Sequence, residues 1–147
     1  MSAKYQIVID VHDATRELKF WAEALRYVPE PPPPGYASWG AFWRARGLAE
    51  SECSDEPDSI VDPEGHAPRI WFHVMPEDKI GKNRLHFDIR ASGEFGKSLA
   101  VRKQLVEDEV ARLVRLGATR LETMFEEGVD HYAVGMLDPE GNEFDVN

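Results

Sequence analysis

Four short segments of the sequence place polar side chains at alternate positions, as a binding or catalytic surface requires. These segments contribute eight side chains to the predicted surface. Seven of the eight offer an oxygen or nitrogen atom to a divalent metal ion or a polar substrate. Because alternate residues of a β-strand point to the same face of its sheet, each set is expected on one polar face. Trp39 and Trp43 are predicted to add an aromatic wall. The eight residues are Gln6, Asp10, Trp71 (the exception), His73, His86, Asp88, Glu143 and Asp145.

The first half of the chain contains strands and a helix that would position half of these residues. Residues 5–13 alternate in polarity and predict a half-buried strand. Asp13 can cap a following helix that ends at Pro29, with one apolar stripe through Leu18, Trp21, Leu25 and Val28. Residues 38–43 and 69–75 are predicted to be strands, with one short strand expected in the long loop between them.

The second half repeats this order. A strand is predicted over 83–90, followed by a helix over 101–117 whose apolar stripe is Val106, Val110 and Leu113. Three more strands are predicted over 118–124, 131–137 and 142–147. The turn sequence Asp-Pro-Glu-Gly starts at Asp62 and again at Asp138, 76 residues later. The turn alone is common, but its repeated setting predicts a tandem βαβββ duplication.

The duplication predicts an α+β fold in one domain over 1–147, made of module 1 (about 4–76) and module 2 (about 82–147). Each module would cover one sheet face with its helix and leave the other face polar. We expect the two modules to form a curved mixed sheet around a cleft lined by these polar faces.

Composition restricts the partners. The formal net charge is -10, which repels nucleic acids and anionic membranes and favours cations. This charge is the reason that we expect no nucleic-acid partner. We also expect no membrane partner, because no stretch approaches the roughly 18 apolar residues of a membrane span. Cys53 is the single cysteine, which excludes an internal disulfide and favours a cytoplasmic location.

Three segments of the sequence resemble one known protein family. They are "MPEDKIGKNRLHFDIR" (75–90), "ARLVRLGATRL" (111–121) and "YAVGMLDPEGNEF" (132–144). In this order, and on these predicted elements, they resemble the glyoxalase-like branch of the vicinal oxygen chelate superfamily. That superfamily includes glyoxalase I, extradiol dioxygenases and bleomycin-resistance proteins, and its fold is the paired βαβββ arrangement.

The resemblance implies a metal site with ligands from the first, fourth, fifth and eighth strands. The matching positions are Gln6, His86 and Asp145. The fourth strand lacks the usual Glu, and Trp71 or His73 lies nearest to that position. The implied cofactor is a divalent ion: zinc, nickel, manganese or iron.

Two functions follow from the resemblance. The first is a metal-assisted lyase or isomerase acting on a small molecule with vicinal oxygens, in which Glu143 or Asp145 moves a proton. The alternative is a metal-free protein that sequesters a cationic aromatic drug, as bleomycin-resistance proteins do. Either function takes a small-molecule ligand and allows a homodimer. The residues predicted to contact the ligand are Trp39, Trp43, Trp71, His73 and Asp88.

Overall fold

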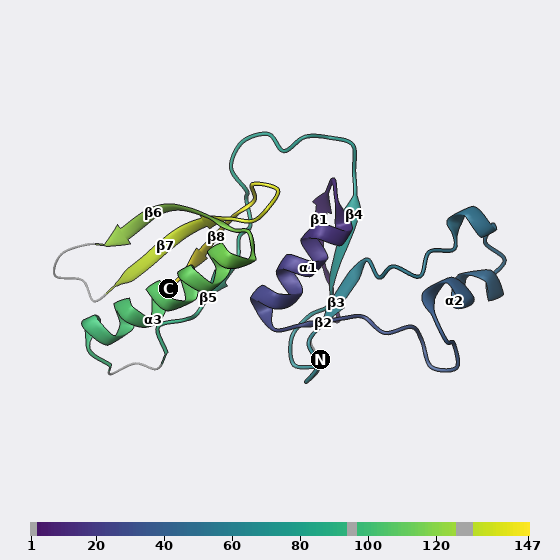
Figure 1. Cartoon of the computed structure of the whole chain (residues 1–147), viewed down its shortest axis with the longest axis horizontal. Helices are drawn as coiled ribbons and strands as arrows, with labels where there is room; N and C mark the ends of the chain where they lie inside the picture. The colour runs from purple at the N-terminus through teal and green to yellow at the C-terminus, as the bar shows by residue number, and fades with distance from the viewer. Residues whose placement is uncertain (1–2, 94–96, 126–130) are drawn as a thin grey trace. The chain divides into compact units, whose positions relative to one another are not determined.

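The computed structural model describes residues 3–93, 97–125 and 131–147, and the chain divides into two units, Met1–Pro76 and Glu77–Asn147 (Figure 1). In the described residues, each unit contains a four-stranded mixed sheet and the elements of a βαβββ module in order. The predicted α+β class and the duplicated module are therefore confirmed. A cleft between the two modules stays a prediction.

The first unit is a sheet with strand order β1-β4-β3-β2, in which β1 runs parallel to β4. Its helix α1 starts after Asp13, whose carboxylate accepts a hydrogen bond from the Arg16 amide at 3.0 Å. Trp21 and Leu18 on this helix are buried in the core with Phe72 of β4. The elements are β1 (Ile7–Val11), α1 (Ala14–Leu25), β2 (Val28–Pro29), β3 (Ser59–Val61) and β4 (Ile70–Val74).

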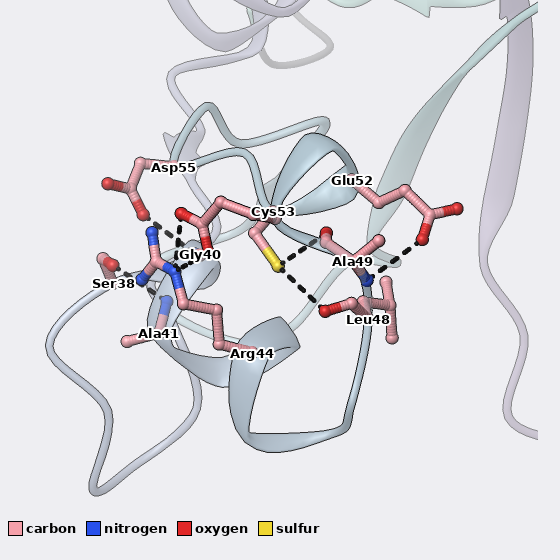
Figure 2. A network of polar contacts seen from close by, with 10 residues as sticks. Ser38, Gly40, Ala41, Arg44, Leu48, Ala49, Glu52, Cys53 and Asp55 are labelled. Atoms are coloured by element: carbon pink, nitrogen blue, oxygen red, sulfur yellow. Dashed lines mark hydrogen bonds and ion pairs between the residues drawn. The ribbon is translucent and has the colours of Figure 1, made fainter.

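The prediction of a strand over 38–43 is wrong, because this segment forms helix α2 (Trp39–Ala45). Two side chains bind the otherwise unpaired amides at its start, which favours a helix over a strand. Ser38 Oγ accepts from the Ala41 amide at 3.2 Å, and Asp55 Oδ1 accepts from the Gly40 amide at 2.8 Å (Figure 2). Asp55 is far along the chain, so its contribution is not visible in the local pattern. The strand position in the module is taken by β2 instead.

Gly40→Ala is expected to destabilise the protein, although alanine is ordinarily the better helix residue. A Cβ atom at position 40 would lie 2.6 Å from Asp55 Oδ1, so the carboxylate must leave the helix start. We expect a fall in Tm of about 2–4 °C, measured by circular dichroism. In an Asp55→Ala background the same substitution should become neutral or stabilising. An equal loss in both backgrounds would contradict this explanation.

The second unit is a sheet with strand order β5-β8-β7-β6, in which β5 runs parallel to β8. Its helix α3 ends at Gly117 in the left-handed region, as the sequence pattern predicts, and begins two residues before the predicted start, where Ser98 caps it. The predicted strand over 83–90 is much shorter, because only Asp88 and Ile89 pair with β8. The elements are β5 (Asp88–Ile89), α3 (Leu99–Leu116), β6 (Thr119–Phe125), β7 (Tyr132–Leu137) and β8 (Glu143–Val146).

One face of the second sheet packs against α3 and forms the core of this unit. The predicted helix stripe of Val106, Val110 and Leu113 is buried there. On β7 and β8 the paired residues of this face are Val134 with Val146 and Met136 with Phe144, all at most 1% exposed. Burial of these side chains removes apolar surface from water and fixes the orientation of both strands.

The opposite face of the second sheet carries the polar residues of β8. Alternation along the strand directs Glu143 and Asp145 away from α3, and they pair across the sheet with Leu137 and Gly135.

Within the described residues, no helix has the length and apolar character needed to span a membrane.

Candidate metal centre

His86, Asp88 and Asp145 form a cluster on the second unit that could hold a metal ion. His86 Nε2 lies 3.4 Å from Asp88 Oδ1 and 3.4 Å from Asp145 Oδ2. One ligand atom from each residue lies within 4.8 Å of the other two. The side chains are 37%, 52% and 27% exposed, in the same order, so solvent reaches all three.

The parallel pairing of β5 with β8 creates this cluster. Asp88 is the register partner of Asp145, so both carboxylates lie side by side on one face. The pairing is held by the Asp145 amide, which donates to the Phe87 carbonyl at 2.8 Å. Asn147 Nδ2 donates to Asp88 Oδ2 at 3.3 Å and orients that carboxylate. His86 therefore enters the cluster from the segment immediately before β5.

The chemistry of these donors fits a divalent ion. An imidazole and two carboxylates provide borderline and hard ligands, the set that zinc, manganese and ferrous iron accept in proteins. Three protein ligands also leave coordination positions for water or a substrate. Two of the predicted metal ligands, His86 and Asp145, are brought together, and Asp88, which was predicted to contact the small-molecule ligand, lies beside them. The pairing between β5 and β8 places Asp88 there, and the local sequence pattern does not show it.

Glu143, the other predicted proton carrier, is held by neighbours on the segment before β5. Its carboxylate accepts from the Asn83 amide at 3.0 Å and from Lys79 Nζ at 3.1 Å. The Asn83 amide and then the Lys79 ammonium lower the pKa of the Glu143 carboxyl to about 2. In this arrangement Glu143 is a weak base, and accepting a proton would require it to release these partners.

Glu143→Gln is expected to lower the free energy of unfolding by about 1–2 kcal/mol at neutral pH, because charge-assisted hydrogen bonds are lost. The folded pKa of Glu143, about 2, lies below its usual 4.5, so the contribution is full above 4.5 and is lost as the pH falls toward 2. Urea unfolding of both proteins between pH 7 and 2.5 would measure this. Glu64→Gln, which removes an exposed carboxylate, serves as the control. A difference that does not shrink in acid would contradict the assignment.

Gln6, the predicted first-strand ligand, is engaged with an arginine in the first unit. Its Oε1 atom accepts from Arg69 NH1 at 2.6 Å. The Arg69 guanidinium also binds the Glu30 carboxylate at 2.7 Å. A divalent ion at Gln6 Oε1 would have to displace this guanidinium, because both are cations. Metal binding by Gln6 stays a prediction, and its contact with Arg69, 63 residues away, is not visible in the local sequence pattern.

The polar face of β1 and β4 brings together Asp10, Trp71 and His73, as alternation predicts. Asp10 and His73 are register partners, and His73 Nδ1 lies 3.1 Å from Asp10 Oδ1. The rings of Trp71 and His73 are 4.6 Å apart, and Trp71 Nε1 donates to Asp58 Oδ2 at 2.8 Å. Ligand binding by Trp71 and His73 stays a prediction.

Trp39 and Trp43 lie on α2 rather than on a strand face. Their rings stack with centroids 5.9 Å apart, and both pack against Phe42. Trp39 Nε1 donates to the Glu30 carbonyl at 2.9 Å, whereas Trp43 remains 36% exposed. Through these contacts both tryptophans take part in the packing of α2. Their role as an aromatic wall for a bound ligand stays a prediction.

The sequence of residues 6–147 matches the family model described as a glyoxalase-like domain. The chain belongs to this family. It is thereby a member of the vicinal oxygen chelate superfamily, and the resemblance drawn from the sequence is confirmed. No curated protein matches the chain in sequence.

Solved structures show the same fold at low sequence identity. A mutant of the fosfomycin resistance protein FosX from Listeria monocytogenes, complexed with Mn(II) and 1S,2S-dihydroxypropylphosphonic acid, matches with a TM-score of 0.63 and 12% identity, over 100% of this chain and 92% of that chain. A glyoxalase/bleomycin resistance protein/dioxygenase family enzyme from Burkholderia phytofirmans matches with a TM-score of 0.59 and 17% identity, over 97% and 94%. At these identities the likeness establishes the fold, and the site must be argued from this chain's own residues.

Proposed function

We propose that this glyoxalase-like protein is a metal-dependent lyase or isomerase that acts on a small molecule with vicinal oxygens. The cluster of His86, Asp88 and Asp145 is the observation that carries the proposal. The Mn(II) in the FosX structure supports it, because that protein has the same fold. The metal proposed for this chain is zinc, nickel, manganese or iron.

A bound divalent ion would act as a Lewis acid toward the substrate oxygens. The chain's own residues set the conditions for that chemistry. Asp88 and Asp145 supply negative charge that offsets the ion, and His86 supplies the nitrogen donor. Proton transfer by Glu143 or Asp145 is also part of the proposal. It requires Glu143 to release Lys79, or Asp145 to act as a base while it serves as a metal ligand.

Metal analysis tests the proposal before any substrate is known. Protein purified without an affinity tag or chelator would be incubated with each of the four metals, desalted and analysed for bound metal. About one ion per chain is expected, after which thiol adducts of dicarbonyl compounds and vicinal diols would be screened as substrates. A chain that retains none of the four ions would overturn the proposal.

The alternative function is metal-free binding of a cationic aromatic compound. The net charge of -10 and the partly exposed Trp43 on the aromatic helix α2 favour it. Titration of bleomycin and of ethidium against the intrinsic tryptophan fluorescence would test it. Saturable quenching that Trp43→Phe abolishes supports this function, whereas no change with either compound excludes it for this compound class.

Cellular location and assembly complete the proposal. The single cysteine and the acidic surface support a cytoplasmic protein that avoids nucleic acids and membranes. We also propose a homodimer, as the family resemblance implies. Sedimentation equilibrium distinguishes a 16.7 kDa monomer from a dimer of twice that mass.

A further inference from the structure

Gly135 lies inside strand β7, where glycine is an unfavourable residue. Its φ is outside the left-handed region, so the backbone conformation does not require glycine. Glycine inside a strand is destabilising relative to alanine, because it loses more conformational freedom on folding. Without a side chain at Gly135, the groups on either side of it have no side chain between them, and one of these groups belongs to the candidate metal centre.

The space above Gly135 separates the metal cluster from strand β6. Gly135 is the register partner of Asp145. A Cβ atom added at position 135 would lie 3.7 Å from Asp145 Oδ1, 3.7 Å from Leu121 Cβ and 3.8 Å from Glu122 Cγ. Any side chain at this position would therefore stand between the Asp145 carboxylate and the Glu122 side chain.

A β-bulge directs Glu122 toward this space. The register of β6 with β7 shifts between Arg120 and Thr123, so Leu121 and Glu122 have no regular partners on β7. Bulges re-aim side chains and are common beside active sites. Arg120 and Thr123 remain on the face near α3, because Arg120 binds both Glu107 of that helix and Thr123. Glu122 instead contacts the opposite face, next to Gly135.

We propose that Glu122 is a further metal ligand, an inference that rests on the function proposed above. The bulge places Glu122 over Gly135, next to the centre formed by His86, Asp88 and Asp145. The Glu122 side chain is exposed. Within the described ranges, its carboxylate makes no hydrogen bond or ion pair that would hold it elsewhere. The proposal requires the Glu122 side chain, whose Cγ already lies over Gly135, to turn its carboxylate toward Asp145 when the ion binds. A fourth protein donor would still leave positions open for substrate on a six-coordinate ion such as Mn²⁺.

The test measures Mn(II) affinity of the full chain, from the electron paramagnetic resonance signal of free Mn(II). Glu122→Gln is expected to weaken binding about 10-fold or more, because the neutral amide oxygen that replaces the carboxylate is a weaker ligand for Mn(II). Glu122→Asp keeps the charge but shortens the side chain by one methylene, so it should weaken binding nearly as much. If Glu122 acted only through its charge, Glu122→Asp would bind as tightly as the wild type, and the proposal would be overturned.

Gly135→Ala tests the path of the side chain. The added methyl group would make only ordinary van der Waals contacts, so the fold should be retained. We expect it to weaken Mn(II) binding, and Glu122→Gln should add no more than about twofold in this background. Leu121→Ala, the other bulge residue, should leave the affinity unchanged. If Glu122→Gln and Gly135→Ala both bind Mn(II) as tightly as the wild type, the role of Glu122 is overturned and the proposed function is not. If the wild-type chain binds no metal, the proposed function itself is overturned.

Discussion

The His86→Ala variant is expected to bind Mn(II) at least about 100-fold more weakly than the wild-type chain. Changes in residues that only orient a ligand already cost 10–100-fold, so loss of a direct ligand should cost more. His86 is the single nitrogen donor of the cluster, so its removal leaves only the two carboxylate ligands. Equilibrium dialysis followed by elemental analysis measures the loss directly.

His66→Ala is the matched control for this substitution. His66 Nδ1 also lies near a carboxylate, 3.5 Å from Glu64 Oε2, but its side chain is 80% exposed and belongs to the surface of the first unit. It should retain the wild-type metal content. Asp145→Asn should lose metal together with His86→Ala, because both supply ligand atoms to one centre. Full metal content in the His86→Ala variant would exclude this cluster as the binding site.

The Phe144→Ala variant is expected to lose about 3–5 kcal/mol of folding free energy. Phe144 is 1% exposed and packs on the face of β8 toward α3, opposite Asp145. Truncating a buried aromatic ring leaves a cavity as well as lost apolar burial. Since a domain of this size is typically stable by about 5–15 kcal/mol, the loss is a large fraction of the total. Urea unfolding followed by circular dichroism gives the value.

Phe125→Ala provides the comparison within the same sheet. Phe125 lies at the end of edge strand β6, is 46% exposed and contacts the Lys103 ammonium at 3.9 Å from the ring centre. Its truncation should cost under about 1 kcal/mol, because an exposed ring loses little burial, one weak cation–π contact and a ring contact with Tyr132. If the two substitutions proved equally costly, the assignment of Phe144 to the core would be wrong.

Local patterns in the sequence were sufficient for the elements with strong periodicity. The stripe of Val106, Val110 and Leu113 predicted α3, and Gly117 predicted its end, because these signals depend on neighbours within a few turns. The same reasoning failed for α2. Its aromatic residues fit a strand as well as a helix, and the deciding hydrogen bond to Gly40 comes from Asp55, which is distant in the chain.

The candidate site divides in the same way. Alternation along single strands predicted that His86 and Asp88 share one face and that Glu143 and Asp145 share another, because the repeat of a strand is two residues. Which of these faces meet, and at what distance, depends on the register between strands. Asp88 lies beside Asp145 only through the parallel pairing of β5 with β8.

The sequence by itself determined the duplicated βαβββ order, the α+β class, the family, and the residue types available for a metal ion. The fold class and the order of elements follow from periodicity along the chain, and the family follows from the resemblance of three ordered segments to known members. Only the tertiary structure decided which donors are neighbours: it placed His86 and Asp88 beside Asp145, tied Glu143 to Lys79, and paired Gln6 with Arg69. The physical reason is that each of these pairings joins strands or loops that are distant in sequence, where register and side-chain packing, rather than local preference, set the distances.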